Sequence, residues 1–386
     1  MSFVTDQSLF IIITGEINVG KSWQFKSALE ATSIDTGEEL FTPCLYLVAE
    51  ASTSGTLGKF LQDASKCVVW RVADCDEALA ALNACFPDGG ALTIAEARRK
   101  EHEHRCKLAE KDKRPKPPQP AEVPPHVGKM TLRSIAVDTG STLYKGSAKT
   151  AMAIAREEIE NGGNPNSKRP KTTRTLSNVG ALNSAMDQGR FAAMRCDALT
   201  DRLNGITQHH AGVLVLVSVH SSAATADVKV SAEGEAPKYE TRVIGCSPDL
   251  GATKTQGPDC LVPGWSKSFM NLAAKANVIW HAGAEYPSLR NYDLGAANEA
   301  ATDPANQAAF YVITQRGEYR GIGRCMWVKV QGSEGEPMEH FLNLPNIWCD
   351  KYPSKNAPVP SPNLGLILSR VVRDINLQAK AMRDAT

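Results

Sequence analysis

The sequence predicts an α/β fold in which a mainly parallel β-sheet is sandwiched between helices. Short apolar runs rich in β-branched residues alternate with segments whose apolar residues recur at helical spacing. The runs are apolar throughout, which is typical of strands that are buried on both faces. A glycine-rich turn joins the first run to the helical segment after it, as expected for a strand–loop–helix unit.

The first part of the chain predicts strands and helices in alternation. The expected strands are Ser8–Thr14, Cys44–Glu50, Cys67–Val72, Leu132–Asp138 and Val213–His220. The expected helices are Lys21–Ala31, Thr56–Ala64, Asp76–Cys85 and Ala185–Leu203. Val213–His220 is the most apolar of the strands, so we expect it at the centre of the sheet.

Two segments interrupt this alternation. Glu96–Pro125 begins with a highly charged run and ends in a proline-rich stretch, so we expect an exposed insertion. Asn161–Thr175 is expected to be a basic loop. Its Lys and Arg side chains could touch a phosphate backbone, but no aromatic residues lie among them, and a solvated loop is the simpler interpretation.

The later part of the chain completes the expected core, which spans residues 1–330. The polar, Gly-rich Ser222–Gly257 is followed by a helix at Ser266–Ala276 and a strand at Ala276–His281. A late β-hairpin is expected, in which Phe310–Thr314 and Arg324–Val330 flank a Gly-containing turn. Residues 331–386 form a C-terminal extension, and its apolar positions from 364 to 382 predict an amphipathic helix.

The composition is that of an ordinary globular protein. Of 386 residues, 42% are hydrophobic and 22% are charged, which argues against a disordered or fibrous chain. With a formal net charge of +1, any nucleic-acid contact must come from local clusters of Lys and Arg. The ten cysteines include no C-x-x-C pair, so we expect reduced, mostly buried thiols. The apolar run Leu9–Ile13 is too short to cross a bilayer, and we expect a cytoplasmic protein with no membrane partner.

The octapeptide Gly15–Ser22 (GEINVGKS) satisfies the pattern G-x-x-x-x-G-K-[ST] between an expected strand and an expected helix. In such a loop, backbone N–H groups and the helix N-terminus surround the phosphates of a nucleotide. We expect Lys21 to reach the β and γ phosphates and the Ser22 hydroxyl to bind Mg²⁺. The segment is therefore predicted to bind Mg-ATP through Gly15, Glu16, Asn18, Val19, Gly20, Lys21, Ser22 and Trp23.

Carboxylates close two of the expected strands. Asp138 ends an apolar strand and is expected to hold Mg²⁺ through water, as a Walker B aspartate does. Glu50 closes the strand that follows the octapeptide and its helix, at the edge where ligands bind in open α/β sheets. We expect Glu50 to polarise the attacking water. The simpler alternative is an aspartate that caps a strand end for Asp138, and a solvated strand-end glutamate for Glu50.

Two further candidates have weaker support. His220 and Ser218 end the central strand, where they could sense the γ phosphate, although a histidine there is often only hydrogen-bonded structure. Arg324, with Arg316 and Arg320, lies around the late hairpin and could stabilise transition-state charge on a neighbouring subunit's nucleotide. Solvated hairpin arginines are an equally good interpretation.

This order of motifs resembles the RecA-like P-loop ATPases, most closely their phage-encoded branch, which includes ATPases associated with single-strand annealing and recombination. In that branch, a helix with a segment like Met186–Gly189 precedes a strand that ends in histidine, and a basic hairpin such as Phe310–Lys329 follows. The resemblance implies a RecA-like fold and Mg-dependent ATP hydrolysis in DNA recombination, replication or repair. It also implies single-stranded DNA as a partner and assembly into homo-oligomers.

The resemblance covers residues 9–330, and the octapeptide is its specific motif. The segments 96–125 and 222–257 are larger than the compact family pattern. A nucleotide-switched binding or assembly module with slow turnover is an alternative function. A DNA packaging or translocation motor is less favoured, because Asp138 is followed by Thr139 where such motors usually carry glutamate.

Overall fold

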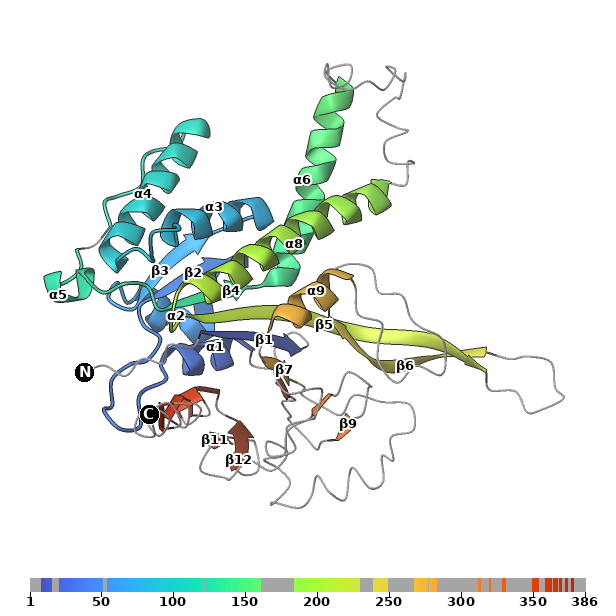
Figure 1. The fold of residues 1–386 in the computed structure, drawn as a ribbon. Coiled ribbons are helices and arrows are strands. Elements are labelled where there is room, and N and C mark those ends of the chain that lie inside the picture. The colour runs from blue at the N-terminus through green and yellow to red at the C-terminus, as the bar shows by residue number, and fades with distance from the viewer. Residues whose placement is uncertain are drawn as a thin grey trace.

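The computed structural model describes most of the first 250 residues and parts of the remainder. The described residues are 8–15, 21–50, 54–120, 122–160, 184–229, 239–248, 267–276, 278–282, 312–313, 319–320, 328–330, 349–353, 358–362 and a set of residues between 364 and 377. They form an α/β fold in which a largely parallel sheet lies between two layers of helices (Figure 1).

The main sheet has the strand order β10-β7-β1-β5-β4-β2-β3. Its strands are β1 (Leu9–Gly15), β2 (Cys44–Val48), β3 (Cys67–Arg71), β4 (Ser134–Asp138), β5 (Leu214–Lys229), β7 (Val278–Ala282) and β10 (Val328–Val330). All neighbours from β7 to β3 are parallel, and β10 joins the edge antiparallel to β7. The predicted central strand β5 does lie inside the sheet, between β1 and β4.

The helices cover both faces of this sheet, which explains the uniformly apolar strands. They are α1 (Lys21–Leu29), α2 (Ser54–Gln62), α3 (Cys75–Cys85), α4 (Ile94–Lys111), α5 (Pro125–Gly128), α6 (Gly140–Glu160), α8 (Ser184–His209) and α9 (Lys267–Lys275). Because side chains alternate along a strand, Phe10 and Ile12 of β1 pack in the cluster with α3, α4 and α8. Ile11 and Ile13 pack in the opposite cluster, with α1 and α2.

The register of the sheet brings the carboxyl ends of the parallel strands to one edge. Gly15 at the end of β1 pairs with His220 of β5. Val48 at the end of β2 pairs with Asp138 at the end of β4. Ligands of open α/β sheets bind beyond this edge, so the strand ends and the loops after them form the candidate site.

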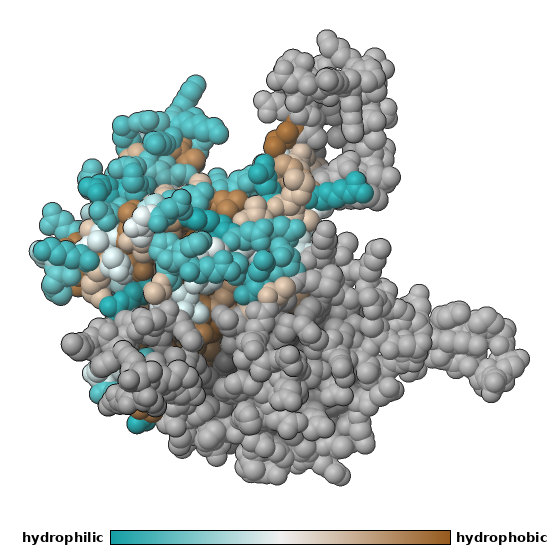
Figure 2. Space-filling view, viewed as in Figure 1, coloured by the Kyte–Doolittle hydropathy of each residue, from teal (hydrophilic) through white to brown (hydrophobic). Residues whose placement is uncertain are grey.

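The charged run after Glu96 is a helix that packs on the sheet, so the expectation of an exposed insertion was wrong for this half of the segment. Helix α4 buries Ile94, Ala97, Glu101, His102 and Ala109, while most of its charged residues face outward. Figure 2 shows that the outward surface over α4 is mainly hydrophilic. A narrow stripe of small and amphipathic side chains is enough to anchor such a helix, and it is hard to recognise among so many charges. The proline-rich residues that follow, 114–120, form no helix or strand.

Replacing Thr93 with alanine is expected to destabilise the protein by about 1 kcal/mol, because Thr93 caps α4. Its side chain accepts from the Glu96 backbone N–H, and the Glu96 carboxylate accepts from the Thr93 N–H, forming a capping box. Urea unfolding monitored by circular dichroism measures the change. Lys100→Ala on the same helix is the control, because the Lys100–Glu103 pair is about half exposed. Equal midpoints for the two variants would contradict the capping role.

Some structural elements next to the site were not predicted from the sequence. Helix α6 follows β4 directly, and a long antiparallel hairpin pairs the outer part of β5 with β6 (Tyr239–Pro248). His220 was expected to end its strand, but β5 continues to Lys229. The parallel pairing with β1 stops at His220, and the antiparallel pairing with β6 starts at the next residue. His220 therefore lies where the chain leaves the parallel sheet.

The late strands differ from the expected hairpin. Strand β8 (Val312–Ile313) pairs antiparallel with β9 (Tyr319–Arg320), so this hairpin closes before Arg324. The end of the expected second strand, β10, joins the main sheet instead. Strands β11 (Cys349–Pro353) and β12 (Pro358–Pro362) form a separate antiparallel pair. Which strands pair with each other depends on the packing of the whole fold. The turn signal at Gly317 and Gly321 is local and carries no information about that packing.

The C-terminal extension packs on the core through its amphipathic helical segment. Leu364, Leu368 and Val372 are four residues apart and lie buried in the cluster with α1. The backbone N–H of Leu364 donates to Oε1 of Gln24, at 3.0 Å. The extension thus helps to hold α1 in place.

Three other expectations concern the basic loop, the cysteines and membrane-spanning helices. The basic loop 161–175 lies outside the described residues. Six cysteines are free thiols, and most are buried, as expected: Cys44, Cys67, Cys75, Cys85, Cys106 and Cys196. Among the helices described, none is both long and apolar enough to cross a membrane.

Candidate active site

Lys21 lies at the corner between β1 and α1, as the octapeptide predicts. Its side chain is only 6% exposed, and its Nζ donates to the backbone oxygen of Gly15 at 2.9 Å. Ser22 follows in the first turn of α1 and is partly exposed. The intervening residues Glu16, Asn18, Val19 and Gly20 lie outside the described part of the chain, as does the side chain of Trp23.

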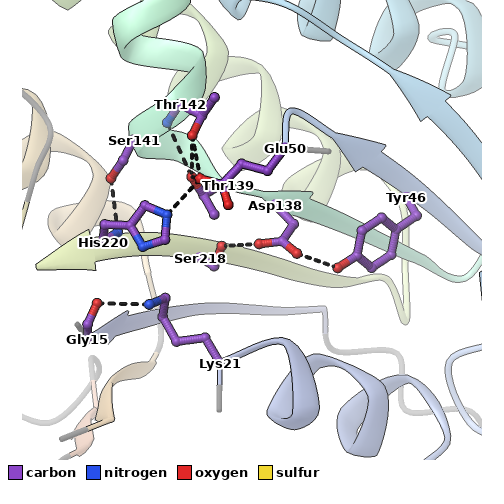
Figure 3. A network of polar contacts seen from close by, with 10 residues as sticks. All are labelled: Gly15, Lys21, Tyr46, Glu50, Asp138, Thr139, Ser141, Thr142, Ser218 and His220. Carbon is purple, nitrogen blue, oxygen red and sulfur yellow. Dashed lines mark hydrogen bonds and ion pairs between the residues drawn. The ribbon is translucent and has the colours of Figure 1, made fainter. Parts of the chain in front are cut away.

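Asp138 is buried at the end of β4, and both of its oxygens accept hydrogen bonds (Figure 3). The Ser218 hydroxyl donates to Oδ1 at 2.7 Å. The Tyr46 hydroxyl donates to Oδ2 at 2.8 Å. The carboxylate is therefore held from β5 on one side and from β2 on the other.

Burial governs the ionisation of this group. Burial raises the pKa of Asp138, while the hydrogen bonds from Ser218 and Tyr46 oppose the rise. Burial, together with the adjacent Asp138 carboxylate, raises the pKa of Tyr46 well above its usual range. Tyr46 therefore keeps its proton and acts as the donor. Lys21 is close enough that its ammonium charge favours the ionised form of Asp138.

Oε1 of Glu50 accepts hydrogen bonds from the start of α6 and from β5 (Figure 3). The Thr142 hydroxyl lies 2.6 Å from this oxygen and the Thr139 hydroxyl 3.4 Å from it. Nε2 of His220 lies 2.7 Å from the same atom. Partial burial acts to raise the pKa of Glu50, but the bonds from Thr142 and His220 outweigh it and lower the pKa. Glu50 is therefore ionised at neutral pH.

His220 is oriented by two contacts on opposite sides. Its backbone N–H donates to the Ser141 hydroxyl at 2.9 Å, and its Nε2 faces Glu50. Within the described residues, its buried Nδ1 has no hydrogen-bond partner. The neutral ring must then carry its proton on Nε2 to donate to Glu50. His220 is linked both to the predicted water-polarising residue and to the base of the β5–β6 hairpin.

The strand order explains how these side chains meet. Because β5 lies between β1 and β4, its Ser218 and His220 stand between the strands that lead to Lys21 and Asp138. Lys21, Asp138, Glu50 and His220 gather at one edge of the sheet (Figure 3). Arg324 lies outside the described residues, so its predicted role stays a prediction.

Four residues of this network were missed in the sequence: Tyr46, Thr139, Ser141 and Thr142. The run of hydroxyl residues after Asp138 carries a usable signal, because Ser and Thr favour helix starts. Thr139 does accept from the Thr142 backbone N–H at 3.2 Å, the geometry of a helix N-cap. Tyr46 gives no such signal, because it lies within an apolar strand.

The donor set suits a magnesium–nucleotide complex. Mg²⁺ prefers oxygen ligands and is usually bound through one or two carboxylates together with phosphate oxygens. The Ser22 hydroxyl and the Asp138 carboxylate are of this kind, and the Lys21 ammonium complements phosphate charge. Among the described residues, no group of three or more His, Cys, Asp or Glu side chains could hold a metal ion.

The chain matches no protein-family model, and comparison with curated proteins gives no significant match. The function must therefore be inferred from the residues of the site.

Proposed function

We propose that this protein is a Mg-dependent ATPase with a RecA-like core. One observation carries the proposal: the buried lysine of a phosphate-binding octapeptide shares a sheet edge with an oriented carboxylate, Asp138, and an ionised one, Glu50. Phosphoryl transfer requires mainly positioning and charge stabilisation, and these groups supply both. The parallel sheet flanked by helices is compatible with a RecA-like fold.

Each residue has a distinct role in this proposal. Lys21 neutralises charge on the β and γ phosphates. The Ser22 hydroxyl would bind Mg²⁺ and Asp138 would hold the ion through water, and the ion would supply charge neutralisation for the phosphates. Glu50 accepts a proton from the attacking water, and its Oε1 contacts to Thr142 and His220 fix its orientation. Arg324 is retained as a candidate for charge stabilisation across subunits.

Calorimetric titration with a non-hydrolysable ATP analogue tests the proposal directly. We expect binding that depends on Mg²⁺, with a dissociation constant in the micromolar range that is typical of enzyme substrates. Parallel titrations with the GTP analogue establish the base preference. Absence of binding to both nucleotides in the presence of Mg²⁺ would rule out the assignment of the site.

We also propose single-stranded DNA as the partner and DNA recombination, replication or repair as the process, on the family resemblance. ATPase assays with and without single-stranded DNA separate this from a nucleotide-switched assembly module. Strong stimulation of ATP hydrolysis by single-stranded DNA supports the DNA role. Slow turnover that DNA does not change favours the nucleotide-switched module.

A further inference from the structure

We infer that Tyr46 is a positioning residue of this site. With Ser218, it forms a hydroxyl clamp that fixes how the Asp138 carboxylate faces the magnesium ion. This role of Tyr46 rests on the proposed function. Tyr46 lies in β2, a strand that is otherwise apolar.

The clamp holds Asp138 from both neighbouring strands. Tyr46 lies on β2 and Ser218 on β5, and β4 runs between these strands. The Tyr46 hydroxyl is 2.8 Å from Oδ2, and the Ser218 hydroxyl is 2.7 Å from Oδ1 (Figure 3). Since each oxygen has its own donor, rotating the carboxylate would break both hydrogen bonds. The clamp therefore selects one orientation of the carboxylate plane.

Burial makes these hydrogen bonds hard to replace. Tyr46 and Ser218 are fully buried, and Asp138 is 3% exposed. Buried hydroxyls need protein partners because bulk water cannot reach them. The Tyr46 ring is itself held edge-on against Phe25 of α1, with a centroid separation of 6.2 Å. The helix that begins with Lys21 and Ser22 therefore packs against the ring whose hydroxyl holds Asp138.

The surroundings of Tyr46 show why the hydroxyl matters. Its ring packs in the cluster that contains Ile13, Phe25 and Ala136, which are fully buried and apolar. Phenylalanine would supply nearly the same ring packing there without a polar atom to satisfy. Tyrosine adds one group, and that group is directed at Asp138. Each carboxylate oxygen still has a second acceptor position, which a water bound to Mg²⁺ can use.

The test is Tyr46→Phe, studied with a fluorescent ATP analogue in EDTA and over a series of Mg²⁺ concentrations. Residues that orient metal-binding groups typically contribute about 10-fold to 100-fold to metal affinity. We expect the Mg²⁺ concentration for half-maximal effect to rise by about 10-fold or more. Affinity in EDTA should stay within about twofold of the wild type, because the phosphate-binding loop is unchanged.

Tyr144→Phe is the matched control. The Tyr144 hydroxyl donates to the backbone oxygen of Gly189 at 3.2 Å, linking α6 to α8. This variant also loses a tyrosine hydroxyl, but its Mg²⁺ response should match that of the wild type. Ser218→Ala removes the other arm of the clamp and should shift the Mg²⁺ response in the same direction as Tyr46→Phe. If Tyr46→Phe does not fold, the Mg²⁺ response of Ser218→Ala tests the clamp in its place.

The possible outcomes distinguish a failure of the clamp from a failure of the proposed nucleotide site. An unchanged Mg²⁺ response in Tyr46→Phe and Ser218→Ala overturns the clamp, provided that the wild type shows Mg-dependent binding. Equal losses of affinity in EDTA and in Mg²⁺ also overturn it, since they indicate a purely structural role. If the wild type binds no nucleotide in either condition, the proposed function fails instead.

Discussion

Lys21→Ala is expected to lower kcat for ATP hydrolysis by about 100-fold to 1,000-fold, the loss typical of removing one preorganised group that stabilises transition-state charge. Lys21 is buried at the strand-to-helix corner and hydrogen-bonded to Gly15, so its ammonium is held in position before nucleotide binds. A steady-state phosphate-release assay at saturating Mg-ATP measures the effect. Nucleotide affinity should also fall, because the same charge contacts the phosphates.

Lys66→Ala is the control for this variant. Lys66 is a partly buried lysine that pairs with Glu39 and precedes β3, at the opposite edge of the sheet. Its loss removes a comparable charge without touching the site, and kcat should be unchanged. Full turnover in Lys21→Ala would show that the octapeptide is not the phosphate-binding loop.

Glu50→Gln is expected to lower kcat by about 100-fold to 10,000-fold, the usual contribution of a general base. Glutamine keeps the shape of the side chain and an oxygen that can accept from Thr142 and His220. It removes the negative charge that draws a proton from water. Binding of the Mg-ATP analogue should therefore stay close to that of the wild type while turnover is lost.

The comparison variant is Glu39→Gln, since Glu39 is also partly buried and pairs with Lys66. It should hydrolyse ATP at the normal rate. If Glu50→Gln instead hydrolyses ATP normally, then Glu50 serves only to anchor His220 and the start of α6, and another group must activate the water.

The fold class could be predicted because its signals are local. A strand buried on both faces must be apolar throughout, and β1, β2 and β4 show this directly in their residues. The octapeptide pattern is equally local, because its glycines, lysine and serine lie within eight consecutive residues. Helix α4 was misjudged for the same reason, since its anchoring residues are few and its charges dominate the local pattern.

The contacts of the site could not be predicted in this way. Tyr46 and Asp138 are 92 positions apart, and His220 and Glu50 are 170 positions apart. Their meeting depends on β4 pairing with β2 on one side and with β5 on the other. The sequence of β2 contains no mark that its tyrosine hydroxyl will face a carboxylate of another strand.

By itself, the sequence determined the alternating elements, the octapeptide Gly15–Ser22 between a strand and a helix, and the strand-end position of Asp138. Backbone propensity and burial pattern act over neighbouring residues, which is why these features could be predicted. The tertiary structure decided which strands are adjacent, and thus that Ser218 and Tyr46 hold Asp138 while Thr142 and His220 hold Glu50. The physical reason is that strand adjacency is set by the packing of the whole core, and hydrogen bonds between side chains follow from that adjacency.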